Sequence, residues 1–297
     1  MADRKLFDDD FLRRLQRLGV LAKRLSAGAG APGQRRSHRL GDGLEFADHR
    51  AYAPGDDIRF LDWPYYARME RLLLRLFHEH SEGAVTILLD ASGSMSLGQT
   101  CKFDYARRTA AALAYVAMAS LDRVHIVPFS DTPHEGLRTG RSRGQILQVL
   151  TFLEELTAGG RTGLARTIEA HARSNDSTGT VMLLTDGIDL TDELSAALAL
   201  LNRHRDEVFF LHLVDRLDAE PSVLGPAQLS PIETSGRLSL NVTEVVLSSY
   251  RQRWREFVRG VEKTCLSRGA IYVQAPTRAP FERLVLRALQ RAGVLGG

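Results

Sequence analysis

The sequence predicts an α/β fold with a doubly wound, mostly parallel sheet flanked by helices. Runs at 85–89, 181–184 and 208–214 are almost wholly apolar, which is typical of strands covered on both faces. Segments with apolar residues at helical spacing separate these runs along the chain. Because strands that alternate with helices form parallel sheets with helices on both faces, this order favours the doubly wound class.

The composition is that of an ordinary globular protein. The 297 residues are 44% hydrophobic and 25% charged, and the formal net charge of +3 is far from a nucleic-acid-binding signature. Cys101 and Cys265, the two cysteines, are too few for a disulfide framework, so we expect a reducing compartment. The longest apolar stretch, 110–121, is too short to span a bilayer, and we expect a cytoplasmic protein with no transmembrane segment.

Residues 1–34 are predicted to form an N-terminal basic helix followed by a flexible linker. Phe11, Leu15 and Leu18 lie at helical spacing, and arginines and lysines occupy much of the remaining helix surface. Such a helix can lie on a membrane or on a partner, but we expect it to pack on its own domain.

Residues 35–80 are predicted to form a segment that packs on the core around a Pro-Gly-Asp-Asp turn at 54–57. Arginines alternate with aspartates near this turn, so we expect arginine–carboxylate pairs to hold an irregular stretch at 44–68 in place. The alternative is a partner-docking surface, because aromatic and arginine side chains are enriched at interfaces. A strand is expected at 71–80.

Residues 81–216 are predicted to form the main domain, and residues 217–297 to complete the same domain with a hairpin and helices. After the first apolar strand we expect a helix at 102–121, a strand at 122–130, helices at 142–156 and 164–172, a strand from Thr180, a helix at 192–204 and a strand at 207–214. The C-terminal part is expected to contain a hairpin at 232–242, a helix at 250–266, an edge strand at 270–274 and a closing helix at 280–292.

The residues that can carry chemistry lie in three loops beside the expected strands. They are Asp90, Ser92 and Ser94 after the first strand, Thr162 in a Gly-Gly-Arg-Thr sequence, and Asp186 after the second strand. Because ligands of open α/β sheets bind at the carboxyl ends of the strands, the three loops can meet at one ion. Carboxylate and hydroxyl oxygens suit Mg²⁺ or Mn²⁺. Each loop alone is an ordinary turn or helix cap, so a metal site requires all three loops to converge.

The order of these motifs, Asp-x-Ser-x-Ser, then Gly-Arg-Thr, then Thr-Asp-Gly, resembles the von Willebrand factor A-type domain. The resemblance implies a metal-ion-dependent adhesion site in which Ser92 and Ser94 bind the metal directly. It implies that Asp90, Thr162 and Asp186 bind the metal directly or through water. The last coordination position would be left for an acidic group on a partner protein.

A second motif, Arg-x-Tyr-x-Pro-Gly-Asp-Asp-x-Arg-x-x-Asp-Trp, starts at Arg50 and precedes the first metal loop. The two motifs together resemble a bacterial group, the domain-of-unknown-function family fifty-eight. Its members are often encoded beside MoxR-type AAA+ ATPases, so the resemblance implies such an ATPase as a partner. It makes residues 35–80 a family-specific segment ahead of a von Willebrand factor A-like domain at 81–216.

From these observations we expect a metal-dependent protein–protein interaction module and not an enzyme. It would be an adaptor that works with a MoxR-type ATPase in the assembly or remodelling of client proteins. The alternative is a divalent-metal-dependent hydrolase, which needs a base or nucleophile, and no histidine or glutamate accompanies the three loops in the sequence. Nucleic-acid binding through Arg35, Arg36 and Arg39 is a third possibility that ranks last, and it predicts strongly salt-dependent binding.

Overall fold

The computed structural model describes residues 5–26, 40–41, 45–53, 56–78, 84–131, 134–140, 142–173, 179–188, 190–204, 206–230, 232 and 236–291. The chain divides into a main unit, Met1–Pro32 with Ala84–Gly297, and a second unit, Gly33–Gly83. Each unit is described by itself. The expected linker at 26–34, the turn residues Pro54 and Gly55, and the basic residues Arg35, Arg36 and Arg39 fall wholly or largely outside the described residues.

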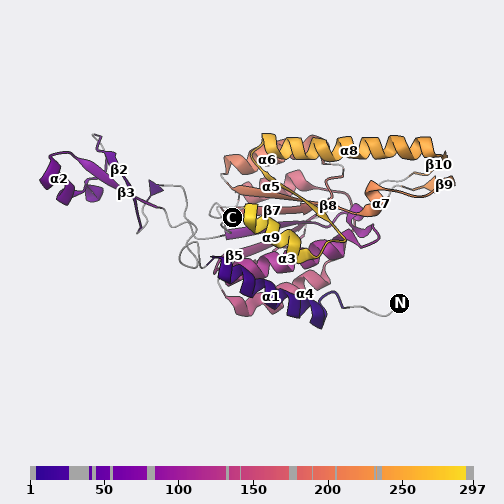
Figure 1. Ribbon diagram of the computed structural model, residues 1–297, viewed down its shortest axis with the longest axis horizontal. Helices are drawn as coiled ribbons and strands as arrows, with labels where there is room; N and C mark the ends of the chain where they lie inside the picture. The colour runs from indigo at the N-terminus through magenta and orange to yellow at the C-terminus, as the bar shows by residue number, and fades with distance from the viewer. Residues whose placement is uncertain are drawn as a thin grey trace. The chain divides into compact units, whose positions relative to one another are not determined.

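The described part of the main unit contains a six-stranded sheet with the strand order β11-β8-β7-β4-β5-β6 (Figure 1). The strands are β4 (Ala84–Asp90), β5 (Arg123–Phe129), β6 (Leu137–Thr139), β7 (Thr180–Thr185), β8 (Glu207–Val214) and β11 (Ile271–Pro276). All neighbours pair in parallel except β5 and β6, which are antiparallel. In chain order this is the 3-2-1-4-5-6 arrangement of doubly wound sheets, so the predicted fold class is confirmed.

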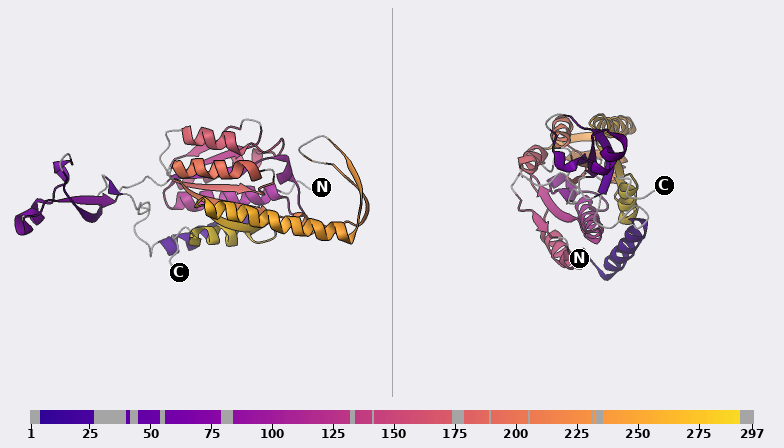
Figure 2. Two further views of the ribbon diagram at one scale, coloured as in Figure 1. Left: turned by 90° about the horizontal axis from the view of Figure 1, so that it is seen from above. Right: turned by 90° about the vertical axis from the view of Figure 1, so that its left-hand side faces the viewer.

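Helices cover both faces of this sheet (Figures 1 and 2). The apolar layer on one face contains α3 (Lys102–Ala119), α4 (Ile146–Glu155) and α9 (Phe281–Arg291), with α1 (Asp9–Ser26) packed on α3 and α9. The other face packs against α5 (Leu164–Arg173), α6 (Thr191–Arg203) and α8 (Glu244–Ser267). The alternation within β4 explains this arrangement, because Ile87 and Leu89 point into the first layer while Leu88 points into the second. Both layers are apolar, which is why β4 and β7 appear in the sequence as nearly unbroken apolar runs.

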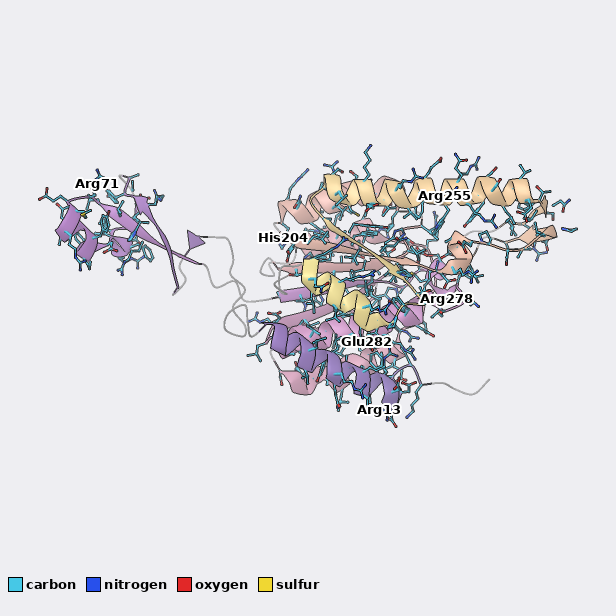
Figure 3. All side chains as sticks on the ribbon, in the orientation of Figure 1. Arg13, Arg71, His204, Arg255, Arg278 and Glu282 are labelled. Carbon is cyan, nitrogen blue, oxygen red and sulfur yellow. The ribbon has the colours of Figure 1, made fainter. Side chains whose placement is uncertain are left out.

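The N-terminal helix α1 packs on its own unit, as the sequence predicts. Phe11, Leu15 and Leu18 are buried in the layer that α3 and α9 share. The Arg14 guanidinium donates two hydrogen bonds to the Glu282 carboxylate of α9, from Nε to Oε1 at 2.5 Å and from Nη2 to Oε2 at 2.7 Å. Figure 3 labels Glu282 beside this helix. The apolar face of α1 is therefore buried against α3 and α9 of the same unit.

The C-terminal part differs from the sequence prediction in its hairpin. The antiparallel pair is β9 (Gly225–Leu229) with β10 (Leu238–Val242), so its first strand lies before Pro231 and not at 232. Pro226 is tolerated there because β9 pairs on one side only, and a missing N–H on the open side of a strand breaks no ladder bond. The short helix α7 (Arg216–Ala219) leads into this hairpin. Helix α8 begins at Glu244, earlier than predicted, because the Thr243 hydroxyl accepts the Val246 N–H and caps it.

The second unit has its own antiparallel sheet in the part that the structure describes. Its elements are β1 (Leu40–Gly41), β2 (Glu45–Ala51), the 3-10 turn η1 (Ile58–Phe60), α2 (Trp63–Met69) and β3 (Leu73–His78), with strand order β1-β3-β2. The stretch expected to be irregular therefore contains a strand. The predicted arginine–carboxylate pairs are present, from Arg50 to Asp56 at 2.8 Å and from Arg59 to Asp57 at 2.6 Å. Packing of this segment on the core stays a prediction.

No helix in the described part of the chain is both long enough and apolar enough to cross a membrane.

Candidate metal-binding site

The first predicted loop folds back on the end of β4. Asp90 is fully buried, and its Oδ1 accepts the Ser92 N–H at 2.9 Å. Its Oδ2 accepts the Thr185 hydroxyl at 2.6 Å, which ties the end of β4 to the end of β7. The Ser92 and Ser94 hydroxyl oxygens lie 3.1 Å apart. Strands β4 and β7 are the pair at which the strand order reverses, the switch point where open α/β sheets bind ligands.

The loop that carries Thr162 is held against the first loop by its backbone. The Gly93 N–H donates to the Gly160 carbonyl at 2.9 Å, and the Gly159 N–H donates to the Ala91 carbonyl at 2.8 Å. Gly160 has φ +78°, and a Cβ on it would lie 2.2 Å from an Asp131 carboxylate oxygen, so this bend needs glycine. The Thr162 hydroxyl oxygen is buried without a hydrogen-bond partner among the described residues. A buried hydroxyl in that state is costly unless a ligand satisfies it.

Asp186, the third predicted contributor, has a partner that the sequence did not suggest. Its Oδ1 accepts the Ile188 N–H at 3.0 Å, and its Oδ2 accepts the Lys102 ammonium at 2.7 Å. Lys102 is the first residue of α3 and is fully buried, and its ammonium also donates to Asp218 Oδ2 at 2.9 Å. The sequence contains only a weak indication that Lys102 belongs to the site. Lys102 is one of four lysines in the chain, and it follows the first predicted metal loop closely.

The charges around these loops do not cancel. Burial, together with the charge of Asp186, raises the pKa of Asp90 to about 7. Burial alone would lower the pKa of Lys102, but the charges of Asp186 and Asp218 outweigh that effect and raise it. The Lys102 ammonium contacts the carboxylates of Asp186 and Asp218 but no contact joins it to Asp90 among the described residues, and a cation near Asp90 would favour the ionised form of that carboxyl.

A histidine that lies outside the three loops in the sequence contacts the backbone of Asp186 in the folded chain. His212 on β8 donates from Nε2 to the Asp186 carbonyl at 2.9 Å, and its Nδ1 accepts the Tyr272 hydroxyl at 2.7 Å. Burial lowers the pKa of His212 to about 4, so the ring is neutral. Both ring nitrogens are engaged, and His212 therefore supports the backbone at Asp186. Sequence reasoning missed it because β8 joins β7 only in the folded sheet.

Asp215, which directly follows β8, accepts hydrogen bonds from three segments near the site. Its carboxylate accepts the Gln99 N–H at 3.0 Å, the Leu217 N–H at 3.0 Å and the Thr277 hydroxyl at 2.6 Å. These bonds hold the loop after Ser94 against the ends of β8 and β11. With its oxygens occupied in this way, Asp215 is a structural carboxylate.

The donor set fits a magnesium-class ion. Octahedral Mg²⁺ with ligands at about 2.1 Å holds neighbouring oxygens about 3.0 Å apart, close to the separation of the Ser92 and Ser94 hydroxyls. The buried Thr162 hydroxyl and the Asp90 carboxylate add oxygen donors of the same class. Asp186 fits differently, because its Oδ2 is already paired with the Lys102 ammonium, whereas both bonds that the Asp90 carboxylate accepts come from uncharged donors. It could contribute through an intervening water.

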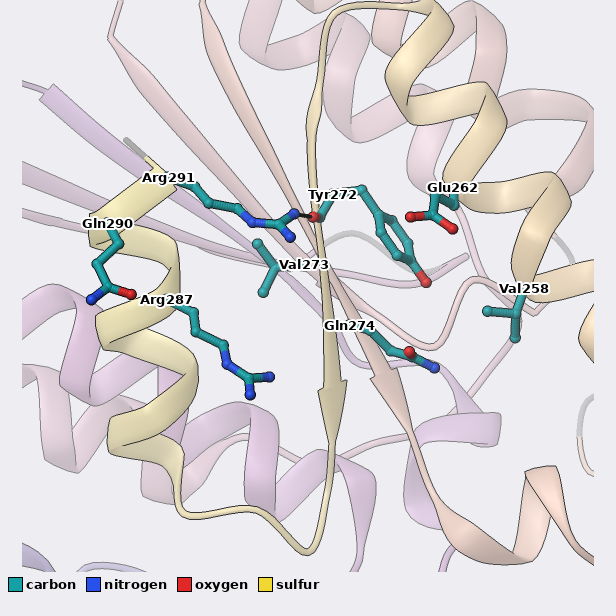
Figure 4. A pocket seen from close by; sticks show the side chains of 8 residues that line it. All are labelled: Val258, Glu262, Tyr272, Val273, Gln274, Arg287, Gln290 and Arg291. Carbon is teal, nitrogen blue, oxygen red and sulfur yellow. Dashed lines mark hydrogen bonds between the residues drawn. The ribbon is translucent and has the colours of Figure 1, made fainter. Parts of the chain in front are cut away.

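A hollow at the edge of the sheet lies apart from these loops, between α8 and α9 beside the edge strand β11 (Figure 4). The Arg291 guanidinium donates to the Tyr272 carbonyl there, which covers part of the open strand edge. The residues that line the hollow are Val258, Glu262, Tyr272, Val273, Gln274, Arg287, Gln290 and Arg291. None of the predicted metal ligands is among them.

The chain is similar to several known proteins. It is 25% identical over 264 residues to "Uncharacterized protein Rv1480" of Mycobacterium tuberculosis, covering 86% of this chain and 83% of that protein. The structure is also similar to that of the conserved hypothetical protein BatB from Bacteroides thetaiotaomicron. The superposition covers 71% of this chain and 98% of the BatB chain, with 15% sequence identity and a TM-score of 0.45. For the von Willebrand factor domain of the type V pili tip protein Mfa5 from Porphyromonas gingivalis, the superposition covers 72% of this chain and 96% of that domain, with 11% sequence identity and a TM-score of 0.35. A family model described as "Protein of unknown function DUF58" matches residues 48–260, more than half of the chain, and the chain therefore belongs to this family.

Proposed function

We propose that the chain is a protein–protein interaction module that binds an acidic group of its partner through a divalent cation, Mg²⁺ or Mn²⁺. Asp90, Ser92, Ser94 and Thr162 would hold the ion, with Asp186 acting through water. The observation that carries the proposal is the buried Thr162 hydroxyl without a described partner, on a loop bonded to the one that places two serine hydroxyls 3.1 Å apart. The cation supplies an electrophilic centre that a carboxylate from outside can complete.

The charge of Lys102 supports a site that accepts a further carboxylate. Lys102 neutralises much of the charge of Asp186 and Asp218, and Asp90 is then the principal carboxylate left for the ion. Fewer protein charges on a hard cation leave it more attractive to an external anion. Removal of Lys102 would therefore make the protein's own ligand set more acidic and the partner's carboxylate less favoured.

The partner that we propose is a MoxR-type AAA+ ATPase, acting with this module in the assembly or remodelling of client proteins in the cytoplasm. The support for it is the resemblance carried by the two sequence motifs. Direct binding of the purified ATPase, measured in Mg²⁺ and in chelator, tests this part separately from cation binding. Equal affinity for the ATPase in the two buffers would show that the cation is not part of the interface.

The alternative, a divalent-metal-dependent hydrolase, needs a general base beside the ion. Among the described residues, the histidine that hydrogen-bonds to Asp186 is His212, and both of its ring nitrogens are occupied. Its low pKa would make it a weak base. The geometry therefore favours binding over hydrolysis.

A titration with Mn²⁺, followed by electron paramagnetic resonance, tests the cation site in the full chain. Ser94→Ala should weaken Mn²⁺ binding at least about tenfold, because it removes a hydroxyl that faces Ser92. Ser96→Ala is the matched control, since the Ser96 hydroxyl in the same loop donates to the Gly93 carbonyl at 2.7 Å. Ser96→Ala should bind Mn²⁺ like the unmodified chain. Equal binding by Ser94→Ala would count against the site.

A further inference from the structure

A second set of side chains of metal-ligand type lies at the opposite end of the strands of the main sheet, near the start of β8. His171 is on α5, His204 directly follows α6, and Asp206 directly precedes β8. Asp206 Oδ2 lies 3.2 Å from His171 Nε2 and 2.8 Å from His204 Nδ1. All three potential ligand atoms lie within 4.8 Å of one another. We call these three residues the His-Asp cluster.

The His-Asp cluster is held in place by buried structure. The Asp206 side chain is 1% exposed and the His171 side chain 5% exposed, whereas the His204 side chain is 18% exposed. Asp206 Oδ1 accepts the Gly179 N–H at 3.0 Å, so the carboxylate orientation is fixed by an atom outside the cluster. Bonds of this kind orient the ligands of metal centres. The exposed edge of His204 gives solvent a route to the cluster.

We propose that His171 Nε2, His204 Nδ1 and Asp206 Oδ2 form a binding site for a transition-metal ion of the zinc class. A tetrahedral zinc ion with ligands at about 2.0–2.2 Å holds neighbouring ligand atoms about 3.3 Å apart. The separations of 3.2 and 2.8 Å are shorter than that value by about 0.1 and 0.5 Å, and the two imidazole nitrogens lie within 4.8 Å of each other. An ion would take the place of the protons that the two rings now share with the carboxylate.

The ligand types separate this site from the one at Asp90. Two imidazoles and one carboxylate suit Zn²⁺ and other borderline cations, whereas an all-oxygen set suits Mg²⁺. Three protein ligands leave the fourth position to water or to an external group.

The two sites are independent in space. Asp206 precedes β8 while the Asp90 site lies at the carboxyl ends of the parallel strands, so a strand length of about 25 Å separates them. Figure 3 labels His204 at one end of the main unit and Arg278, whose guanidinium donates to Gln99 near the Asp90 loops, toward the other end. An ion at the His-Asp cluster would join α5, α6 and β8.

The test uses the full chain without an affinity tag, stripped of metal and titrated with Zn²⁺ against a chromophoric chelator. We expect one Zn²⁺ per chain at this site, and His204→Asn should weaken its binding about 100-fold or more. His49→Asn is the matched control, because His49 Nε2 also lies 2.8 Å from a carboxylate, that of Asp62, but in the second unit. His49→Asn and Asp90→Asn should leave Zn²⁺ affinity at this site unchanged.

Two results would overturn the proposal. One is the lack of Zn²⁺ binding by the unmodified chain, and the other is binding that survives His204→Asn but is lost with Asp90→Asn. Cobalt substitution keeps the test valid if His204→Asn does not fold. Co²⁺ in the unmodified chain should give the intense visible bands of a four-coordinate nitrogen and oxygen site, and a spectrum of six-coordinate Co²⁺ alone would contradict the assignment.

Discussion

At the scale of single residues, Lys102 decides how charge is distributed in the core of the site. A lysine ammonium with no exposure persists only because Asp186 and Asp218 lie 2.7 and 2.9 Å away. Neither carboxylate adjoins Lys102 in the sequence, and all three residues meet only after β4, β7 and β8 have assembled. This is why the sequence predicted Asp186 as a ligand but not the cation that holds it.

The substitution Lys102→Met should lower the free energy of unfolding by about 3–5 kcal/mol, because it leaves buried carboxylates without their counter-charge. Urea unfolding at neutral pH measures this effect. Lys263→Met on the exposed surface of α8 is the control and should change stability by less than about 0.5 kcal/mol. Similar stabilities for the two variants would mean that the ammonium contributes little.

The Thr162 loop offers a second residue-scale test in two adjacent glycines. Gly160→Ala places a methyl group against Asp131 at φ +78°, and it should cost about 1–2 kcal/mol of stability and weaken Mn²⁺ binding. Gly159→Ala meets no atom within 4 Å and should leave both quantities nearly unchanged. Urea unfolding and Mn²⁺ titration of the two variants distinguish them. An unimpaired Gly160→Ala variant would show that the bend does not depend on glycine.

At the scale of elements, the sequence located the parallel strands of the main sheet well because their signals are local, but it did not predict the short antiparallel strand β6. Apolar runs flanked by polar loops marked β4, β7 and β8, and helical periodicity marked α3 and α6. The hairpin was misplaced because Pro226 and Pro231 both suggested a loop, although a two-stranded ribbon tolerates proline on its open edge. The His-Asp cluster was missed because its three ligands come from three different elements.

The N-terminal helix provides a pH-dependent test of how elements are joined. The bonds from Arg14 outweigh the effect of burial and lower the pKa of Glu282 below 4.5, so their stabilisation is present above that pH and is lost as the carboxylate becomes protonated. Arg14→Ala should therefore cost about 0.5–1 kcal/mol at neutral pH, because the pair is partly exposed to solvent, and less at about pH 3, where more of the carboxylate is protonated. Urea unfolding at both pH values measures this difference. Arg13, whose side chain is 67% exposed, provides the control, and Arg13→Ala should have a small effect at either pH. A pH-independent cost for Arg14→Ala would contradict the ion-pair account.

At the scale of the whole molecule, the two proposed metal sites lie at opposite ends of the parallel strands. The oxygen-bearing side chains of the first proposed site lie at the carboxyl ends of β4 and β7, and the imidazoles of the second lie near the start of β8. The first grouping could be predicted from the sequence, because each loop directly follows a strand or leads into a helix and the doubly wound topology brings the loops together. The second grouping depends on where α5 and α6 end, which sequence patterns locate poorly.

The most direct test of the cation site is a crystal structure of the full chain grown with Mn²⁺, using anomalous diffraction to locate the ion. The account predicts an anomalous peak about 2.2 Å from the Ser92 and Ser94 hydroxyl oxygens, near Asp90 and Thr162, with Asp186 still paired to Lys102. A crystal at millimolar Mn²⁺ with no peak among these residues would contradict it. So would a peak bound directly by Asp186 with Lys102 displaced.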